Sequence, residues 1–300
     1  MGKTSISWTE HSWNPTRGCS RISPGCLHCY AERMAGRFCG LGRQDRGKCE
    51  DGPFAGFAEI TPAGARWTGK VELIPEMLDI PLRRKKPTTY FVNSMSDLFH
   101  ERLSDEAIDR VFAVMALSPQ HTFQVLTKRA ERMQHWASEQ NPYATVAHRI
   151  AVNAANIAAH FPRDFPNAHS RPWPLPNVWL GVSVGYQMRK SRIDLLRQAP
   201  AAVRFLSLEP LLEDLGTLDL EGIDWVIVGG ESGPGARPCD IAWIRSIVRQ
   251  CKEAGVRCFV KQWGANPWCG YKAVLLRDRK GENPVEWPED VRVREYLQCR

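Results

Sequence analysis

Short apolar runs alternate with amphipathic stretches of helical length from the middle of the chain onward. The runs are rich in Val, Ile and Phe, whereas the stretches between them repeat their apolar positions at helical spacing. This alternation is typical of repeated strand-helix units. The predicted strands are Thr89–Asn93, Thr122–Leu126, Val178–Val182, Arg204–Leu208, Trp225–Val228 and Arg257–Val260.

These units predict an α/β fold, a partial (β/α) barrel of about six or seven parallel strands. A further strand near Ile6–Trp8 would nearly close the barrel. The clearest helix covers Asp105–Leu117, where apolar residues fall on one face and Ser104 is the predicted N-cap. The barrel is expected to occupy residues 1–264, and the polar extension of residues 265–300 is expected to pack on it.

Two segments interrupt the alternation and are interpreted as surface insertions. The first, Cys39–Gly69, is rich in Gly and is predicted to be a long loop near the site. The second, about residues 142–176, is rich in Pro, Ala and His and is predicted to carry a helix over Thr145–His160.

Composition restricts the class of protein. The 300 residues are 43% hydrophobic and 24% charged, which excludes a disordered, collagenous or coiled-coil chain. No apolar run approaches the roughly 20 residues of a membrane span, and the N-terminal segment lacks a signal peptide's apolar core. A cytoplasmic location is therefore expected, in the host cytoplasm if a phage encodes the protein. The net charge of +7 favours a polyanionic partner.

Polar residues cluster just after the predicted strands. In a parallel barrel the carboxyl ends of the strands share the face on which active sites are built. Polar residues also end strands in proteins that have no site there, so a purely structural role stays open. The candidates are Asn93, Ser94, Ser96, Asp97, Lys128, Arg129, Ser183, Glu209, Gly230, Glu231, Arg237, Lys261 and Gln262.

Cysteine spacing carries the strongest chemical signal. Three cysteines fall within eleven residues, directly before a predicted helix that begins at Tyr30. They are Cys19, Cys26 and Cys29. Three thiolates so close indicate metal ligands. They can hold three irons of a 4Fe-4S cluster and leave the fourth iron open to a small chelating molecule. The remaining cysteines lack close ligand spacing, so a single cluster is expected.

A structural zinc site is the alternative for this loop. Tetrahedral zinc requires a fourth ligand, for which His11, His28 and Cys39 are available. In that case the chain would be a zinc-stabilised nucleic-acid-binding module without catalysis. The ligand spacing alone leaves both metals open.

Seven sequence blocks resemble one known family. From about Ser7 to Gly264, the chain is similar to the phage-associated three-cysteine-motif family of radical S-adenosylmethionine (SAM) proteins, which is distantly similar to spore photoproduct lyase. Six residues separate Cys19 from Cys26, as is normal for that family, whereas Gly185 and Tyr186 replace an expected acidic or amide pair. The blocks are GCSRISPGCLHCYAE, NSMSDLFHE, LTKR, WLGVSV, RFLSLEPLL, VIVGGESGPGARP and FVKQWG.

The resemblance implies a 4Fe-4S cluster on Cys19, Cys26 and Cys29, with SAM bound at the open iron. The methionine end of SAM would be bound by the segment after the first long strand, unless Ser96 or Asp97 only caps a turn. That segment contributes Asn93, Ser94, Ser96 and Asp97. Later strand ends would contact the ribose, the ammonium group or the adenine through Ser183, Glu209, Gly230 and Glu231, with Glu209 alternatively a structural carboxylate.

The side chains of this chain that are implied to act on the substrate are cationic, amide and thiol groups. Lys128, Lys261 and Gln262, with Arg129 and Arg237, would bind a phosphate-bearing or carboxylate-bearing substrate. Cys239 could return a hydrogen atom to a substrate radical, although packing is the alternative role of this residue. A reductant such as flavodoxin or ferredoxin is the implied partner.

The implied substrate is a nucleic acid or a nucleotide. A base in duplex DNA would have to be flipped out or presented in a single strand. The most specific expectation is an isomerase-like or lyase-like step of phage DNA hypermodification, which rearranges an amino-acid-type adduct on the 5-methyl carbon of thymidine. Repair of a DNA lesion and modification of tRNA are the alternatives with the same cofactors.

Overall fold

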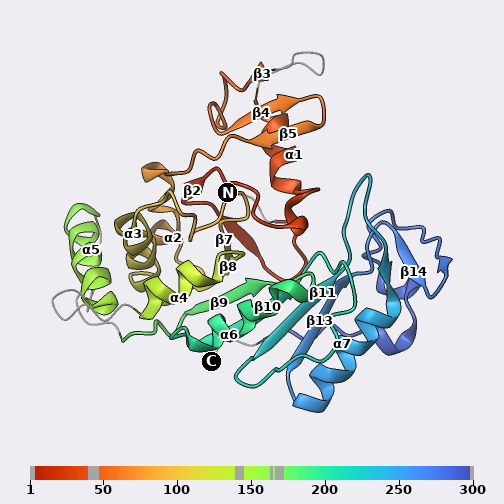
Figure 1. Cartoon of the computed structure of the whole chain (residues 1–300). Helices are drawn as coiled ribbons and strands as arrows, with labels where there is room; N and C mark the ends of the chain where they lie inside the picture. Colours follow the sequence, from red (N-terminus) through yellow and green to blue (C-terminus); the bar gives the residue numbers. More distant parts are fainter. Residues whose placement is uncertain (1–3, 40–46, 139–144, 163–164, 166–171, 298–300) are drawn as a thin grey trace. The chain divides into compact units, whose positions relative to one another are not determined.

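The computed structural model describes residues 4–39, 47–138, 145–162, 165 and 172–297 (Figure 1). The chain forms two compact units. The first unit comprises Met1–Ser5, Thr9–Trp179 and Ala199–Ala202, and the second comprises Ile6–Trp8, Leu180–Gln198 and Val203–Arg300. No helix among the described residues has the length and apolar character needed to cross a membrane.

Parallel strands form the centre of each unit. The hydrogen-bonded order is β1-β7-β8-β9-β10-β11-β13, in one seven-stranded sheet. All six predicted strands are present, which confirms the α/β class and the parallel arrangement. The strands are β1 (His11–Trp13), β7 (Thr89–Val92), β8 (Thr122–Thr127), β9 (Val178–Ser183), β10 (Val203–Leu208), β11 (Trp225–Gly229) and β13 (Arg257–Gln262).

The strand predicted at Ile6–Trp8 is wrong. This segment has no regular secondary structure, and the first strand is β1, five residues later, paired in parallel with β7. Trp8 is nevertheless buried, because its ring packs against Phe205 and Trp225 within the second unit. Burial of the tryptophan therefore explains the apolar pattern without a strand.

Helices of the first unit follow their sequence signals closely. They are α1 (Tyr30–Arg37), α2 (Ile80–Arg83), α3 (Asp105–Ala116), α4 (Ala130–Ser138) and α5 (Val146–His160). The Ser104 side chain accepts the Ala107 N–H at the start of α3, as predicted. The Thr145 side chain accepts the His148 N–H at the start of α5 in the same way, so the predicted helix in the second insertion is confirmed.

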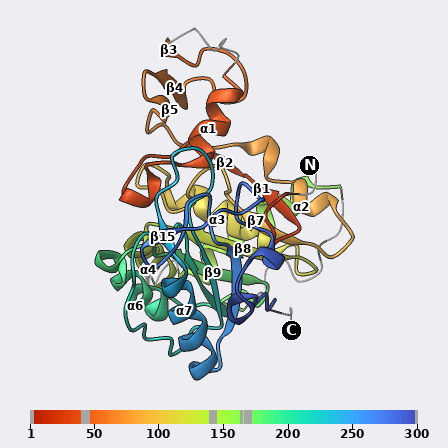
Figure 2. The ribbon, with the colours of Figure 1, turned by 90° about the vertical axis from the view of Figure 1, so that its right-hand side faces the viewer.

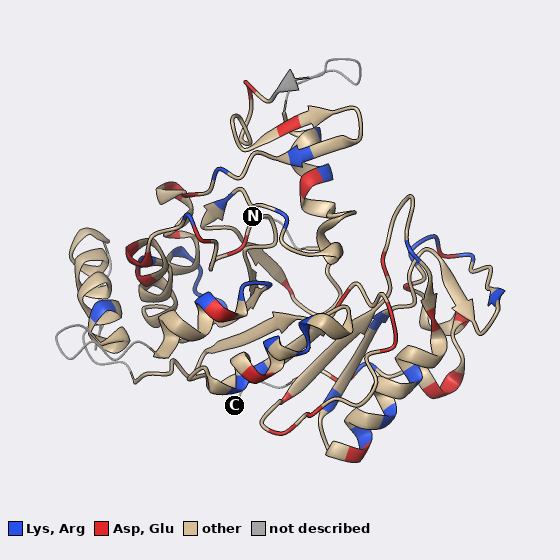
Figure 3. Ribbon diagram, in the orientation of Figure 1, with Lys and Arg blue, Asp and Glu red and all other residues tan. Residues whose placement is uncertain are grey.

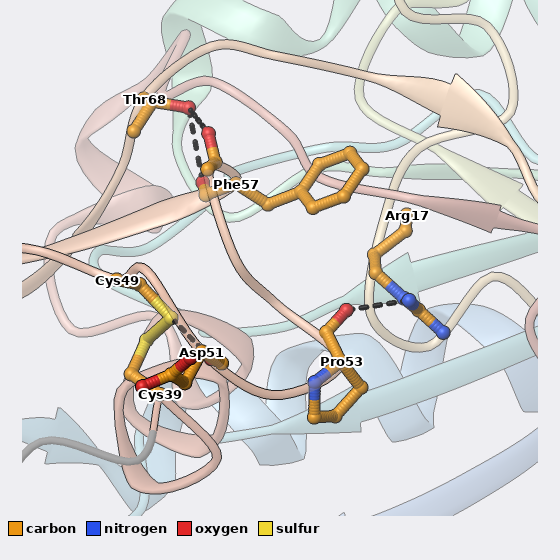
Figure 4. Close-up of a disulfide and its surroundings, with 8 residues drawn as sticks. Arg17, Cys39, Cys49, Asp51, Pro53, Phe57 and Thr68 are labelled. Carbon is orange, nitrogen blue, oxygen red and sulfur yellow. Dashed lines mark hydrogen bonds between the residues drawn. A yellow bond between two sulfur atoms is a disulfide. The ribbon is translucent and has the colours of Figure 1, made fainter.

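The first insertion is not the long loop that its glycines predicted. It forms an antiparallel sheet of β3 (Gly47–Lys48), β4 (Ala58–Thr61) and β5 (Gly64–Trp67). A disulfide joins Cys39 to Cys49, and both cysteines are buried against Phe54 and Phe57 (Figure 4). An apolar cluster and a covalent bond thus organise the described part of this segment. A second, two-stranded ladder pairs β2 (Thr16–Arg17) with β6 (Glu72–Leu73).

The second unit combines its parallel strands with two helices and a small C-terminal sheet (Figure 2). Its elements include α6 (Ser191–Gln198), α7 (Ile241–Ala254), β12 (Cys239–Asp240), β14 (Pro267–Cys269) and β15 (Lys272–Ala273). The C-terminal segment packs inside this unit: Trp287 is 2% exposed, and the Trp225 indole donates to the Glu295 carbonyl at 2.8 Å.

Candidate functional site

The three-cysteine loop lies between β2 and α1 and is shaped by tight turns. Gly18 has a φ of +89°, and a Cβ atom there would lie 2.0 Å from the Lys70 carbonyl oxygen, so only glycine fits. Cys26 ends a 3-10 turn that Pro24 begins, and Cys29 is the N-cap of α1. The loop therefore places its three thiols at three successive bends.

The three thiols lie within electrostatic reach of one another but differ in ionisation. Burial, followed by the charge of Asp97, raises the pKa of Cys19 to about 12, and the thiolates of Cys26 and Cys29 add to this rise. Burial also raises the pKa of Cys29. Burial opposes ionisation of Cys26 as well, but Lys128 and nearby hydrogen-bond donors outweigh it and lower the pKa of Cys26.

The described residues contain no group of three or more His, Cys, Asp or Glu side chains arranged to hold a metal ion as they stand. Cys26 and Cys29 lie near enough to Cys19 to affect its ionisation, and Lys128 affects both Cys26 and Cys29. The donor type is nonetheless that of iron-sulfur and zinc sites.

Asp97 is buried five residues after the end of β7 and accepts hydrogen bonds with both carboxylate oxygens. Oδ1 accepts the Thr127 hydroxyl at 2.6 Å and the Phe99 N–H at 3.1 Å. Oδ2 accepts the Lys128 N–H and an Nη1–H of Arg129, each at 3.1 Å. Asp97 thus joins the end of β7 to the end of β8, and its predicted contact with SAM would have to be added to these bonds.

Arg129 connects this carboxylate to the cysteine loop. Its guanidinium is buried and donates to the Ser20 carbonyl at 3.2 Å, to the Ser20 hydroxyl at 2.9 Å and to Cys19 Sγ at 3.8 Å. Burial lowers the pKa of Arg129, but the charges of Asp97 and Cys19 outweigh burial and raise this pKa overall. The side chain therefore stays charged. A fixed positive charge therefore lies beside the first cysteine.

His100 supports the same loop from the other side of Ser20. Nδ1 accepts the Arg102 N–H at 3.1 Å, so the neutral ring carries its proton on Nε2, which lies 2.8 Å from the Ser20 hydroxyl. Burial, followed by the positive charge of Arg129, lowers the pKa of His100 to about 4. The ring is accordingly neutral at physiological pH.

The other residues predicted after β7 also lie against the cysteine loop. Gly18 and Ser96 form an isolated parallel bridge, and the Ser96 hydroxyl lies 2.9 Å from that of Thr16. The Tyr30 hydroxyl at the start of α1 donates to the Ser94 carbonyl. The structure thus brings Ser94, Ser96 and Asp97 to the three-cysteine loop, as their sequence position predicted.

Asn93 differs from its neighbours because part of its side chain is unused. The residue is 3% exposed and has a φ of +62°. Its Oδ1 accepts the Thr16 N–H at 3.4 Å, whereas its Nδ2 is buried without a hydrogen-bond partner. A buried donor left unpaired costs free energy, so a carboxylate or carbonyl of a bound molecule would be stabilised there.

In the second unit, the predicted residues form two ion-paired groups. Glu209 binds Lys261 at 2.9 Å and accepts the Ser207 hydroxyl at 3.3 Å, and the Ser183 hydroxyl donates to the Glu209 carbonyl at 2.9 Å. Side chains at the ends of β9, β10 and β13 are therefore joined around one partly exposed carboxylate.

The second group surrounds Glu231. Its carboxylate accepts the backbone N–H and the Nε–H of Arg237, each at 3.0 Å. Gln262 donates to the Gly230 carbonyl at 2.8 Å. A Cβ atom at Gly230 would lie 2.1 Å from the Trp263 carbonyl oxygen and 2.8 Å from Cys239 Cβ. This glycine is thus required by internal packing, in addition to any ligand contact.

Cys239 is fully buried behind this glycine. Burial, followed by the charge of Asp240, raises the pKa of its thiol to about 12, so the thiol is neutral. Gly185 also has a packing reason, because a Cβ atom there would lie 2.1 Å from the Pro210 carbonyl oxygen. Close approach of backbone therefore accounts for the glycine that departs from the family pattern.

Sequence reasoning missed an ion pair across the cysteine loop. Glu32 is 1% exposed, and its two carboxylate oxygens each accept Arg21 Nε–H at 3.0 Å. Oε1 also accepts the Trp67 N–H at 3.3 Å. The signal was present in the sequence, since Glu32 lies in the first turn after Cys29. The pair ties the loop to α1 and to β5.

The disulfide corrects one candidate ligand. Cys39 was available as the fourth ligand of a zinc site, but its sulfur is bonded to Cys49. A thiolate is required for ligation, so Cys39 cannot serve while the disulfide persists.

The model of one protein family, described as "Protein of unknown function (DUF5131)", matches residues 3–285. No curated protein and no solved structure matches the chain.

Proposed function

We propose that this chain, which belongs to the DUF5131 family of proteins of unknown function, is a radical SAM enzyme acting on a nucleic-acid or nucleotide substrate. One observation carries the proposal: three free cysteines share one loop, the buried Arg129 guanidinium donates to Cys19 Sγ, and the buried Asn93 Nδ2 has no hydrogen-bond partner among the described residues. The most specific form is rearrangement of an amino-acid-type adduct on the 5-methyl carbon of thymidine in phage DNA.

The donor set fits a 4Fe-4S cluster with one open iron. Cys19, Cys26 and Cys29 supply three thiolates, and Arg129 and Lys128 offset negative charge beside them. The backbone N–H groups in the first turn of α1 have no partners within the helix. They lie beside Cys29, the N-cap, where they favour its thiolate. With Cys39 held in a disulfide, the zinc alternative retains His11 and His28 as candidates for its fourth ligand.

When bound, the cluster and SAM together supply one-electron cleavage of SAM and abstraction of a hydrogen atom from an unreactive C–H bond. The chain's own residues bind and orient. Asn93 Nδ2 would donate to the carboxylate of SAM, and the Ser94 and Ser96 hydroxyls bond to Asn14 and Thr16, just before the loop. Asp97 acts through Arg129, whose guanidinium it holds in place.

The charged groups of the second unit have, by themselves, the chemistry to bind a nucleotide. Glu209 with Lys261, and Glu231 with Arg237, present hydrogen-bonding groups and paired charges that can bind hydroxyl, amino or phosphate groups. Gln262 and Ser183 orient the neighbouring backbone. The neutral thiol of Cys239 has the protonation state needed to return a hydrogen atom. A base taken from duplex DNA must first leave the stack.

Anaerobic reconstitution with iron and sulfide tests the chemistry. We expect a brown protein that converts SAM to 5′-deoxyadenosine when supplied with flavodoxin or dithionite. Cys26→Ala should lose both colour and cleavage, whereas Cys269→Ser, which alters an exposed cysteine outside the loop, should retain them. Tight retention of colourless zinc without SAM cleavage would contradict the proposal and favour the zinc-binding module.

Mass spectrometry of nucleosides tests the substrate. Modified phage DNA, damaged DNA and tRNA would each be incubated with reconstituted enzyme, SAM and reductant. A thymidine adduct of unchanged mass but altered chromatographic retention is expected from the modified phage DNA. A changed nucleoside from lesion-bearing DNA or tRNA alone would replace this substrate with one of the two alternatives.

A further inference from the structure

A second feature of the chain points to a nucleic-acid contact outside the residues discussed above. Residues 271–280 follow the turn at Gly270 and include β15, which pairs antiparallel with β14. Tyr271 is 101% exposed and Leu275 is 98% exposed. We call residues 271–280 the basic ribbon, because they contain four cations, Lys272, Arg277, Arg279 and Lys280, against the single acid Asp278.

The acids in and around the basic ribbon are directed at the chain's own amides. Asp278 accepts the N–H groups of Lys280 at 3.3 Å and of Asn283 at 3.1 Å. Glu286 accepts the N–H of Arg277 at 2.5 Å. These carboxylates stabilise the local turns through backbone hydrogen bonds.

The cations of the basic ribbon are exposed. Within the described part of the chain, Lys272, Arg277 and Arg279 make no ion pair, and Lys280 approaches Glu282 only to 3.9 Å with 58% of its side chain exposed. The charges along this segment can be followed in Figure 3, where Lys and Arg are blue. An unpaired cluster of this kind attracts phosphates.

We propose that the basic ribbon binds single-stranded nucleic acid. Tyr271 would stack on an unpaired base, and Lys272, Arg277 and Arg279 would contact phosphates. Every base offers a flat face to an exposed aromatic ring, so this combination of stacking and charge is tolerant of sequence. A duplex keeps its bases stacked on each other, which leaves Tyr271 without a partner.

The composition of the ribbon favours a nucleic acid over a membrane surface. Only two large apolar side chains, Tyr271 and Leu275, are fully exposed in it. Stable attachment to a bilayer requires a larger buried apolar area than these supply. The ribbon could deliver the substrate strand of the proposed enzyme, but its binding needs neither cluster nor SAM.

The scaffold beneath the ribbon is held independently of the proposed contact residues. Trp268 Nε1–H donates to the Asn266 side chain, and the Val274 N–H donates to the Pro267 carbonyl, both at 2.8 Å. Substitution of the exposed side chains should therefore leave the fold intact, which circular dichroism and the melting temperature can verify.

Fluorescence anisotropy of a labelled single-stranded DNA oligonucleotide, measured with the full chain without iron at two salt concentrations, tests the proposal. K272A/R277A/R279A should weaken binding at least tenfold at low salt and reduce the salt slope by about 2, since each phosphate contact on a single strand contributes about 0.7. Tyr271→Ala should weaken binding roughly fivefold or more with the slope unchanged.

The matched control is K85A/K86A/R249A, which removes the same charge from exposed positions elsewhere. Its affinity should stay within twofold of the parent's. Equal losses in both triple variants would overturn the proposal and indicate diffuse charge attraction, as would tighter binding to phosphatidylserine vesicles than to the oligonucleotide. Because SAM cleavage is assayed separately, failure here leaves the cysteine-loop proposal intact, and the reverse also holds.

Discussion

The two ends of helix α1 are held by different kinds of interaction. At its N-terminal end, Cys29 belongs to a loop held by Arg21–Glu32 and by the buried Arg129–Asp97 pair. Beyond its C-terminal end, Cys39 is bonded to Cys49 inside an apolar cluster. Nine residues thus separate Cys29, which is free and surrounded by charge, from Cys39, which is oxidised and surrounded by hydrocarbon.

This difference assigns separate roles to the two ends. Directional ion pairs and hydrogen bonds orient thiols, yet leave them available as ligands, and they respond to pH and to loss of one charge. A disulfide in an apolar cluster restrains the chain but offers no ligand. We therefore expect damage at the charged end to affect the loop, whereas damage at the disulfide should affect stability alone.

The largest effect is expected from Arg129→Met. Loss of the cation leaves the buried Asp97 carboxylate uncompensated, which should lower the free energy of unfolding by about 3–5 kcal/mol in urea denaturation. The exposed Arg249→Met should change it by less than about 0.5 kcal/mol. Adding Asp97→Asn to Arg129→Met should recover part of the loss. An Arg129→Met protein as stable as the Arg249→Met control would show that the pair contributes nothing to the charged end.

Next in size is the disulfide. C39A/C49A should lose about 2–3 kcal/mol, because the cross-link closes a segment with a sequence separation of 10. Dithiothreitol should bring the parent protein close to the variant's stability and leave the variant unchanged. Iron content after reconstitution should be equal in both proteins. A fall in iron content in step with stability would mean that the two ends of α1 are not separable.

The pH dependence of the charged end should follow His100. Its pKa of about 4 lies below the ordinary 6.5, so between these values the unfolded chain binds more protons than the folded one. The contribution of the neutral His100 ring to the free energy of unfolding is fully present above pH 6.5, and it is lost as the pH falls toward 4. It should amount to about 2 kcal/mol between pH 7.5 and pH 5.

Urea unfolding at several pH values measures this loss. His100→Gln should flatten the curve in that window, whereas His148→Gln, at an exposed position on α5, should reproduce the parent's curve. Parallel curves for His100→Gln and the parent protein would rule out His100 as the source of acid sensitivity.

The local pattern of apolar and capping residues was sufficient to predict most of the sheet and the capped helices. β7, β8 and β9 consist of buried apolar runs, and Ser104 and Thr145 have the side chains that cap a helix. The strand prediction at Ile6–Trp8 failed because an apolar pattern reports burial, and Trp8 is buried without being in a strand.

The sequence was sufficient to predict which residue types form the candidate site and at which strand ends they lie. It was not sufficient to predict which of these side chains bond to one another. Asp97 and Arg129 could be named from their positions after β7 and β8. Their mutual bond, and that of Arg129 to Ser20, join positions 32 and 109 residues apart, which no local rule specifies. Pairing of Cys39 with Cys49 likewise depends on the apolar cluster around them, since sequence alone does not fix connectivity.

The smallest effect, and the sharpest test of the comparison, comes from Glu32→Gln. Glutamine keeps an acceptor for the Trp67 N–H but removes the charge that binds Arg21, whose side chain is 25% exposed. Stability should fall by only about 1 kcal/mol, yet the metal-free loop should open more often. Modification of Cys26 and Cys29 by a disulfide reagent should then accelerate severalfold. Asp79→Asn, which breaks an exposed ion pair with Arg83, provides the control and should leave those rates unchanged. If Glu32→Gln also leaves them unchanged, the ion pair stabilises α1 without orienting the thiols, and the distinction between the two ends of the helix must rest on Arg129 alone.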